Sequence, residues 1–468
     1  MKMLWKTHLI AAVMAVPSLT GNAVTPAASP LQDSIPSAWS YESPQLITSP
    51  SDDRWWEEFD DPVLTDLIRR GGAQSLDLRQ TYRRIEIARQ NVLESKAAYS
   101  PTLGLSAGWT RERSSGDMMP HGAATTMSYF SLGLNFSWEI DVFGRVRQQV
   151  KSGNAALGAT KADYEAAMVS LASNIATAYI NFRLAQGRAE LARAQIESQR
   201  KIEAIAEARF ETGLASKLDV TQARTVLYST QATLPEIENA ERSAIRDIAL
   251  LTGCYPDSLA YLLKTAPRLP NPFRMVKVGV PADLLRRRPD VAAAEYELAG
   301  YAAQVGIAKK DFLPVLSLDG AVGTSARNIG DMFTDKSFTY SIAPSLSWTI
   351  FEGLARSRRV AAAKEQMLIG IDNYNQTVLS AYIETENALG EYEAYLKEIS
   401  LIQSVCNTSD ESFSLAVDRY KRGLAGFYDV MNSQLSVLQY RNSLLQTKAA
   451  ALVALIKVYA AVAGSPER

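Results

Sequence analysis

The sequence predicts an α+β membrane protein made of two copies of one plan: a helix, two strands, a very long helix, a tight turn and a second long helix. Three observations predict this fold class. Motifs recur at a fixed spacing, four segments alternate apolar and small polar residues, and long stretches are rich in strong helix formers. Beyond the N-terminal leader, no apolar run reaches the ~18 residues of a transmembrane helix. Membrane insertion therefore has to use β-strands, the other structure that satisfies its own backbone in lipid.

The repeat is visible at a spacing of 210 residues. Residues 209–215 read RFETGLA and residues 419–425 read RYKRGLA. Asp219 and Asp429 follow at the same spacing, and the pair Ser137-Trp138 recurs as Ser347-Trp348. Self-similarity at a fixed spacing indicates a repeated structural unit.

The repeat sets the expected domain organisation. An extended segment over 24–60 precedes a first repeat over 61–264, a linker over 265–281 leads to a second repeat over 282–464, and residues 465–468 form a C-terminal tail. Closely spaced prolines mark a loop, so we expect the linker, with four prolines, to cross the surface.

Four segments show the period-2 alternation of strands, with apolar residues on one face and small or polar residues on the other. They cover about 101–111, 128–139, 314–324 and 339–350. This pattern is a weak signature of transmembrane strands, and a soluble two-faced sheet is the alternative. Trp109, Trp138 and Trp348 end apolar faces, so we expect them at the membrane interface.

Four strands cannot close a barrel, because the smallest natural membrane barrels have about eight. An open sheet edge in lipid leaves backbone N–H and C=O groups unpaired, at several kcal/mol each. If these strands span a membrane, several chains must share one barrel. The strand count alone does not choose three chains.

Long helices follow each strand pair and are expected over about 145–211, 217–252, 355–422 and 428–463. A helix of some 65 residues would be a rod of roughly 100 Å. Gly213 and Gly423 lie between paired helices and suit a left-handed residue at a helix end. Pro235 should kink its helix or mark a local irregularity.

Shorter helices precede each strand pair. One is expected from Pro62 to about Ala98, with Gly71-Gly72 as a break, and the other from Pro289 to about Asp311. The N-terminus has a basic start, a short apolar stretch and small residues before Ala23. This order is typical of a secretory signal peptide, here residues 1–23.

Composition excludes several function classes. A net charge of −1 gives no field to attract nucleic acid. The two histidines are His8 in the leader and His121 in a Gly/Met/Pro-rich stretch, which leaves little room for His-based catalysis or metal binding. Cys254 and Cys406 are too few for a disulfide framework, and we expect both to be free thiols. We expect no catalytic residues, metal or cofactor.

Four motifs then occur in order along the chain. They are Trp56, Phe59 and Leu64; Trp138 to Arg145, reading WEIDVFGR; Leu284 to Gly306, with RRPDV at 287–291; and Tyr420 to Gly423. Together they resemble the TolC-like outer-membrane factors, and more closely the NodT/OprM branch of that family. The resemblance covers nearly the whole mature chain, from about Trp55 to Gly464.

The resemblance implies a homotrimer. Twelve strands would form a β-barrel in the bacterial outer membrane, continuous with a periplasmic α-barrel of twelve helices in coiled-coil hairpins and a mixed equatorial region. It implies a passive channel-tunnel that exports small molecules such as drugs or other toxic compounds. The implied partners are a periplasmic membrane-fusion adaptor, an inner-membrane transporter of the RND type and outer-membrane lipid.

The resemblance also implies site residues at the periplasmic tip. Asp219, Tyr420, Asp429 and Asn432 would hold or line the aperture, and Gly213, Leu214, Gly423 and Leu424 would form the turns where the adaptor docks. Asn432 stands where a second aperture acid is common, and Ala425 where a locking arginine can occur. We therefore expect a less acidic constriction and a lock with fewer ion pairs. The alternative for Asp219 and Asp429 is simple helix capping.

Asn22 stands where many relatives of this branch carry an acylated cysteine, so we expect no lipid anchor. Three rival functions stay open: a type I-like protein secretion duct, a soluble periplasmic coiled-coil scaffold, and a membrane-bound enzyme. The scaffold explains the helices but not the alternating strands. The enzyme would need a nucleophile–base pair or a metal cluster, and the sequence offers neither.

Overall fold

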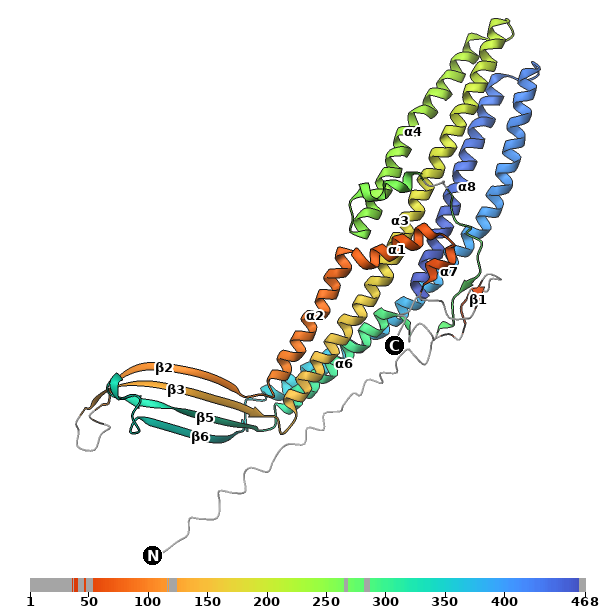
Figure 1. Ribbon diagram of the computed structural model, residues 1–468. Helices are drawn as coiled ribbons and strands as arrows, with labels where there is room; N and C mark the ends of the chain where they lie inside the picture. The colour runs from red at the N-terminus through yellow and green to blue at the C-terminus, as the bar shows by residue number, and fades with distance from the viewer. Residues whose placement is uncertain are drawn as a thin grey trace, which may run out of the picture.

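The structure, a computed structural model, is an elongated molecule with a sheet at one end and two helical hairpin turns at the other (Figure 1). It describes residues 36, 38–40, 46–47, 54–115, 117, 124–264, 268–281 and 287–462. The predicted signal peptide, Asn22, both histidines and the C-terminal tail lie outside the described residues.

One four-stranded antiparallel sheet contains the predicted strands, in the order β2-β3-β5-β6. The strands are β2 (Thr102–Arg113), β3 (Thr126–Ile140), β5 (Val315–Ala326) and β6 (Phe338–Ser347). Each repeat contributes one hairpin, and β3 pairs with β5 across the repeats. In this sheet β2 and β6 are the edge strands, which agrees with the place of Pro344 in β6.

The register gives the sheet one apolar face and one polar face. Leu105 lies opposite Leu134, Leu134 opposite Val322, and Val322 opposite Tyr340, so one apolar row crosses all four strands. Because side chains alternate along each strand, the intervening rows hold serine, threonine, glycine and asparagine. Leu105, Tyr340 and Ile342 are about three-quarters exposed. Such an apolar face needs lipid or another chain to cover it.

The fourth strand is shorter than predicted. It was expected over 339–350, but β6 ends at Ser347. Trp348 lies just past it, and its indole N–H donates to the carbonyl of Phe312 at 3.0 Å. In the first repeat, the indole N–H of Trp138 donates to the carbonyl of Tyr99 at 2.9 Å. These two tryptophans therefore fasten the helix end of the sheet, while Trp109 lies in β2 toward the opposite end.

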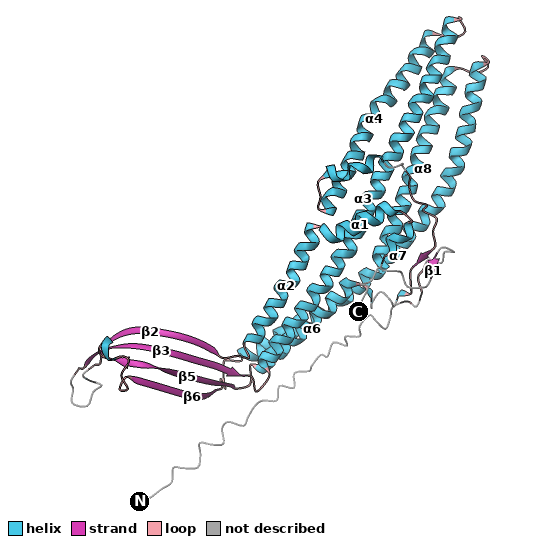
Figure 2. Ribbon diagram, in the orientation of Figure 1, coloured by secondary structure: helices cyan, strands magenta, loops and turns pink. Residues whose placement is uncertain are grey.

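Two hairpins of long helices form most of the rod (Figure 2). They are α3 (Arg145–Glu211) with α4 (Lys217–Thr252), and α7 (Ala355–Lys421) with α8 (Phe427–Val462). The helices have 67 and 36 residues in each hairpin. Helix α4 continues through Pro235. Helix α8 is long and apolar enough to cross a membrane, but 61% of its apolar window is buried in the fold, as in a core helix.

The first short helix breaks at a different residue than predicted. The break is at Ser75, between α1 (Pro62–Gln74) and α2 (Leu76–Ala97), and not at Gly71-Gly72. Gly71 lies inside α1, where a Cβ atom would come within 2.3 Å of the Ile175 side chain. It therefore allows close packing of α1 on α3. In the second repeat α6 spans Pro289–Lys310, with Pro289 in its first turn.

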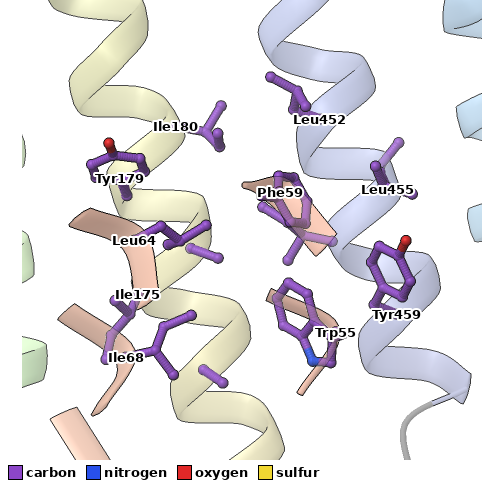
Figure 3. Packing of buried hydrophobic residues seen from close by; sticks show 14 of the residues in the cluster. Trp55, Phe59, Leu64, Ile68, Ile175, Tyr179, Ile180, Leu452, Leu455 and Tyr459 are labelled. Carbon is purple, nitrogen blue, oxygen red and sulfur yellow. The ribbon is translucent and has the colours of Figure 1, made fainter. Parts of the chain in front are cut away.

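A belt of short elements crosses the middle of the rod. It includes η2 (Trp55–Phe59), α1, η4 (Pro256–Lys264) and a parallel pair of two-residue strands, β1 (Leu46–Ile47) with β4 (Val276–Lys277). Figure 3 shows η2 and α1 side chains filling the space between α3 and α8. Trp55 is 1% exposed and stacks on Tyr459 with ring centroids 5.4 Å apart. Burying these aromatic rings fixes the belt to both hairpins.

Two buried tyrosines also fasten the belt by hydrogen bonds. The Tyr179 hydroxyl donates to Asp61 at 2.6 Å, and the Tyr459 hydroxyl donates to Glu58 at 2.5 Å. Burial, and then the carboxylate partner, raises the pKa of each phenol above its ordinary value. Both phenols therefore keep their protons and act as donors at neutral pH.

The two cysteines are free thiols: Cys406 is buried in α7, and Cys254, which follows α4, is half-buried. The Thr252 hydroxyl lies 3.2 Å from the Cys254 sulfur.

Corresponding junctions lead into α3 and α7. Gly144 and Leu354, again 210 residues apart, both precede the helix in the left-handed conformation, with φ of 78° and 66°. Glycine adopts this conformation freely, whereas another L-residue pays about 1–2 kcal/mol. The second junction is therefore strained.

We predict that Leu354→Gly raises the free energy of unfolding by about 0.5–1 kcal/mol, because relief of the left-handed strain exceeds the added chain entropy. The matched change Gly144→Ala should lower it by a similar amount. Denaturant midpoints of the purified proteins check both changes. Equal midpoints for Leu354→Gly and the wild type would show that the junction stores no strain.

Candidate functional site

The two hairpin turns have the same backbone geometry. In the first, the N–H of Gly213 donates to Phe210 O and that of Leu214 to Arg209 O, at 2.9 and 2.7 Å. In the second, Gly423 and Leu424 make the corresponding bonds at 2.9 Å each. Gly213 and Gly423 have φ of 73° and 74°. This is the Schellman motif, which satisfies the last carbonyls of a helix and explains the glycine in each turn.

The return helices begin differently. In the first hairpin, Ser216 caps α4: its hydroxyl accepts from the N–H of Asp219 at 3.3 Å and donates to the Asp219 carboxylate at 2.7 Å. In the second hairpin, Gly426 occupies the matching position and has no side chain to do this. Asp219 therefore has a capping role as well as any role at an aperture.

A small apolar cluster holds the two tips together. It contains Ile202, Ala206, Val220, Ala223, Tyr420, Phe427 and Val430, drawn from all four long helices. Tyr420 is 3% exposed and packs edge-on against Phe427, with centroids 5.6 Å apart. The cluster lets the tips of the two hairpins behave as one unit.

Arg209 joins the hairpins by polar contacts. Its guanidinium donates to the carbonyl of Lys421 at 2.9 Å and to that of Leu214 at 3.1 Å, and lies 4.8 Å from the centre of the Tyr420 ring. The matching Arg419 donates only to the carbonyl of Leu424, at 3.4 Å, in its own turn. The two repeated arginines therefore differ in role. The repeat revealed both, but which one crosses the gap depends on how the hairpins pack.

Of the four predicted aperture residues, the structure brings Asp219 and Tyr420 together. The Tyr420 hydroxyl donates to the Asp219 carboxylate at 3.4 Å, which is long for such a bond. Burial, and then the charge of Asp219, raises the pKa of the Tyr420 phenol, so the phenol keeps its proton and donates. Asp429 and Asn432 are exposed, and neither makes a described side-chain hydrogen bond.

Two exposed surfaces lie near the tips. Leu214 and Leu424 are 67% and 65% exposed at the turns, although both are apolar. Farther along, α7 and α8 line a hollow of about 470 Å³ with hydroxyl-bearing side chains. These are Ser404, Thr408, Ser409, Ser412, Ser433, Ser436 and Tyr440. Small side chains of this kind allow close approach of another helix. Over the described part of the chain, no group of three His, Cys, Asp or Glu side chains could hold a metal ion.

Comparison with known proteins identifies the family. The sequence profile of the family described as outer membrane efflux protein matches residues 67–254 and 280–464. The chain therefore belongs to this family, which confirms the TolC-like resemblance. Its members are channel proteins of the outer membrane with a periplasmic extension, and this protein shares that location.

Individual relatives agree with this assignment. Nodulation protein T of Rhizobium leguminosarum bv. trifolii is 29% identical over 82% of this chain and 81% of its own length. The solvent efflux pump outer membrane protein SrpC of Pseudomonas putida is 28% identical over 87% and 86%. The solved structure of the outer-membrane channel OprN superposes with a TM-score of 0.85 and 28% identity, over 92% of this chain and 97% of that one.

We predict that Arg209→Ala loosens both tips, because it removes the bond to Lys421 and the stacking on Tyr420. Amide hydrogen exchange near residues 206–224 and 416–431 should be about tenfold faster, the factor for a loss of ~1.4 kcal/mol. Arg419→Ala is the matched control and should affect only its own turn. Equal effects of the two substitutions, each confined to one turn, would contradict the bridging role.

Proposed function

We propose that three copies of this chain form the outer-membrane duct of a tripartite efflux system. The observation that carries the proposal is the sheet itself: four strands with an exposed apolar face and unpaired edges at β2 and β6. Three such sheets, joined edge to edge, give a closed barrel of twelve strands. Family membership and the names of the relatives support the efflux assignment.

In this assembly the apolar face meets lipid and the polar face lines the lumen. Trp138 and Trp348 would lie at the inner boundary of the membrane and Trp109 toward the outer one, where aromatic side chains are favoured. The long hairpins would extend into the periplasm. Exposed apolar residues along α4 and α7, among them Leu218 and Leu401, would be buried between neighbouring copies as the second barrel closes.

We propose that the hairpin tips form the closing end of the duct. Contacts of Arg209 and Asp219 with Tyr420 and its neighbours hold the hairpins of one copy together, and the exposed Asp429 and Asn432 would face the aperture. Opening requires the hairpins to separate. A few hydrogen bonds of about 1 kcal/mol each and the small apolar cluster at the tips oppose this, so a docking partner has to supply the energy.

A periplasmic adaptor would dock at these tips. The apolar turn residues Leu214 and Leu424, with the hydroxyl-lined hollow between α7 and α8, offer a surface for partner helices. An inner-membrane transporter, of the RND type by family analogy, would then supply energy. The exported cargo would be small and toxic, as the solvent efflux name of one relative suggests. Transport through the duct itself would be passive.

The efflux assignment is tested in a strain that lacks the gene. Deletion should raise the accumulation of a fluorescent pump substrate such as ethidium, and the wild-type gene on a plasmid should restore low accumulation. If deletion leaves accumulation of ethidium and of a solvent-like dye unchanged while adaptor and transporter are produced, this chain is not the duct of that system.

The same strain tests the gate. Tyr420→Phe removes the bond to Asp219 but keeps the ring against Arg209 and Phe427. The tip should open more readily, by about fivefold for a loss of ~1 kcal/mol, and cells should become more sensitive to vancomycin, a large polar antibiotic. Tyr428→Phe is the matched control, because the Tyr428 side chain is 63% exposed. Equal sensitivity of the two variants would argue against a tyrosine lock.

A further inference from the structure

The polar face of the sheet presents one charged side chain between its ends. Along β2, β3, β5 and β6 this face carries glycine, alanine, serine, threonine, asparagine and tyrosine, with Met127 and Val315 near strand ends. Its acids are Glu112 and Glu139, each one residue from a strand end, and Asp319, in the interior of β5. Within these four strands, no lysine or arginine lies on this face. Asp319 is thus an isolated negative charge on the surface proposed to line the lumen.

Small residues surround Asp319 on every side. Directly across the sheet, Asp319 lies opposite Ser137 on β3 and Ala343 on β6, and Ser137 in turn lies opposite Thr102. Along its own strand, the nearest residues on the same face are Ser317 and Ala321. None of these side chains is long enough to cover the carboxylate, and Asp319 is half-buried in the sheet.

Hydroxyl groups hold the carboxylate in place. Ser137 donates to one oxygen of Asp319 at 2.7 Å, and Ser317 donates to the other at 3.2 Å. Ser317 is itself 2.7 Å from the hydroxyl of Ser345 on β6. Hydrogen bonds from these neutral hydroxyls orient the carboxylate without cancelling its charge. The charge of Asp319 is therefore held at a fixed place on the sheet.

The charges at the helix end of the sheet differ, because they are paired. Glu139 is bound by Arg145 through bonds of 2.8 to 3.1 Å. Glu352 is bound by Arg356 at 3.1 Å and by Arg359 at 2.7 Å. The one-to-one Glu139–Arg145 pair largely cancels its own field beyond a few ångströms, whereas Glu352 with two arginines leaves one net positive charge at this end. The field of Asp319 has no such partner on the strands.

We propose that Asp319, repeated in each copy around the barrel, makes the lumen selective for cations and so favours cationic cargo. This inference rests on the proposed trimeric duct. Fixed charges of one sign in a channel lined by low-dielectric walls raise the local concentration of counter-ions. Salt screens the field of a fixed charge over the Debye length, which is about 30 Å at 0.01 M salt, about 10 Å at 0.1 M and about 3 Å at 1 M. Selectivity should therefore be strong in dilute salt and weak in concentrated salt.

The test uses the purified full-length protein in planar lipid bilayers, with reversal potentials measured across KCl gradients. In dilute salt the wild type should pass K⁺ in preference to Cl⁻. Asp319→Asn keeps the size and an oxygen acceptor for Ser137 but removes the charge, and should lower the K⁺/Cl⁻ permeability ratio at least about twofold. In ~1 M salt the two proteins should converge.

Two further variants separate charge from structure. Asp319→Glu keeps the charge and should keep the selectivity, and Ser345→Ala removes a nearby hydroxyl and should also keep it. An unchanged permeability ratio in a conducting Asp319→Asn channel would overturn this inference while leaving the duct intact. Because a closed tip would also block current, each variant is recorded in the Tyr420→Phe background as well, and absence of conductance there too would instead contradict the proposed duct itself.

Discussion

The unpaired backbone groups at the two edges of the sheet are the constraint on which the rest of the structure depends. Strands β2 and β6, of 12 and 10 residues, have no partner on their outer sides among the residues that the structure describes. In lipid each unpaired group costs several kcal/mol, whereas a whole domain is stable by only about 5–15 kcal/mol. A single copy inserted in a membrane would therefore be unstable, which is the physical reason for proposing that other copies complete the barrel.

The helical rod of one copy also leaves surface uncovered, in this case apolar side chains. Helices α3 and α8 bury their apolar residues against the central belt, but apolar side chains on α4 and α7, such as Tyr228 and Leu415, are exposed in one copy. Burial of such surface contributes about 25 cal/mol per Å². The assembly that closes the barrel in lipid can also cover these helices. Because one copy spans both regions, closure of the sheet and packing of the rods are linked.

Much of this architecture follows from local sequence patterns. Period-2 alternation placed the four strands within about three residues of their observed ends, and the long helices begin and end within one residue of the prediction. Errors arose where packing decides: Gly71 lies inside α1 with the Ile175 side chain against it, and the helix break is at Ser75. At the tip, the repeat marked Arg209 and Arg419 equally, yet only Arg209 crosses between hairpins. That difference depends on contacts between distant segments, which a local pattern does not contain.

The most direct test of the central claim is the oligomeric state of the folded protein in a bilayer. Native mass spectrometry of the purified protein, released from lipid nanodiscs in which far-ultraviolet circular dichroism shows intact strands and helices, counts the copies in each particle. The unpaired edges predict more than one copy and no folded monomer, and the proposed twelve-stranded barrel sets the number at three. A stable, lipid-inserted particle that holds one copy with its sheet intact would contradict the account.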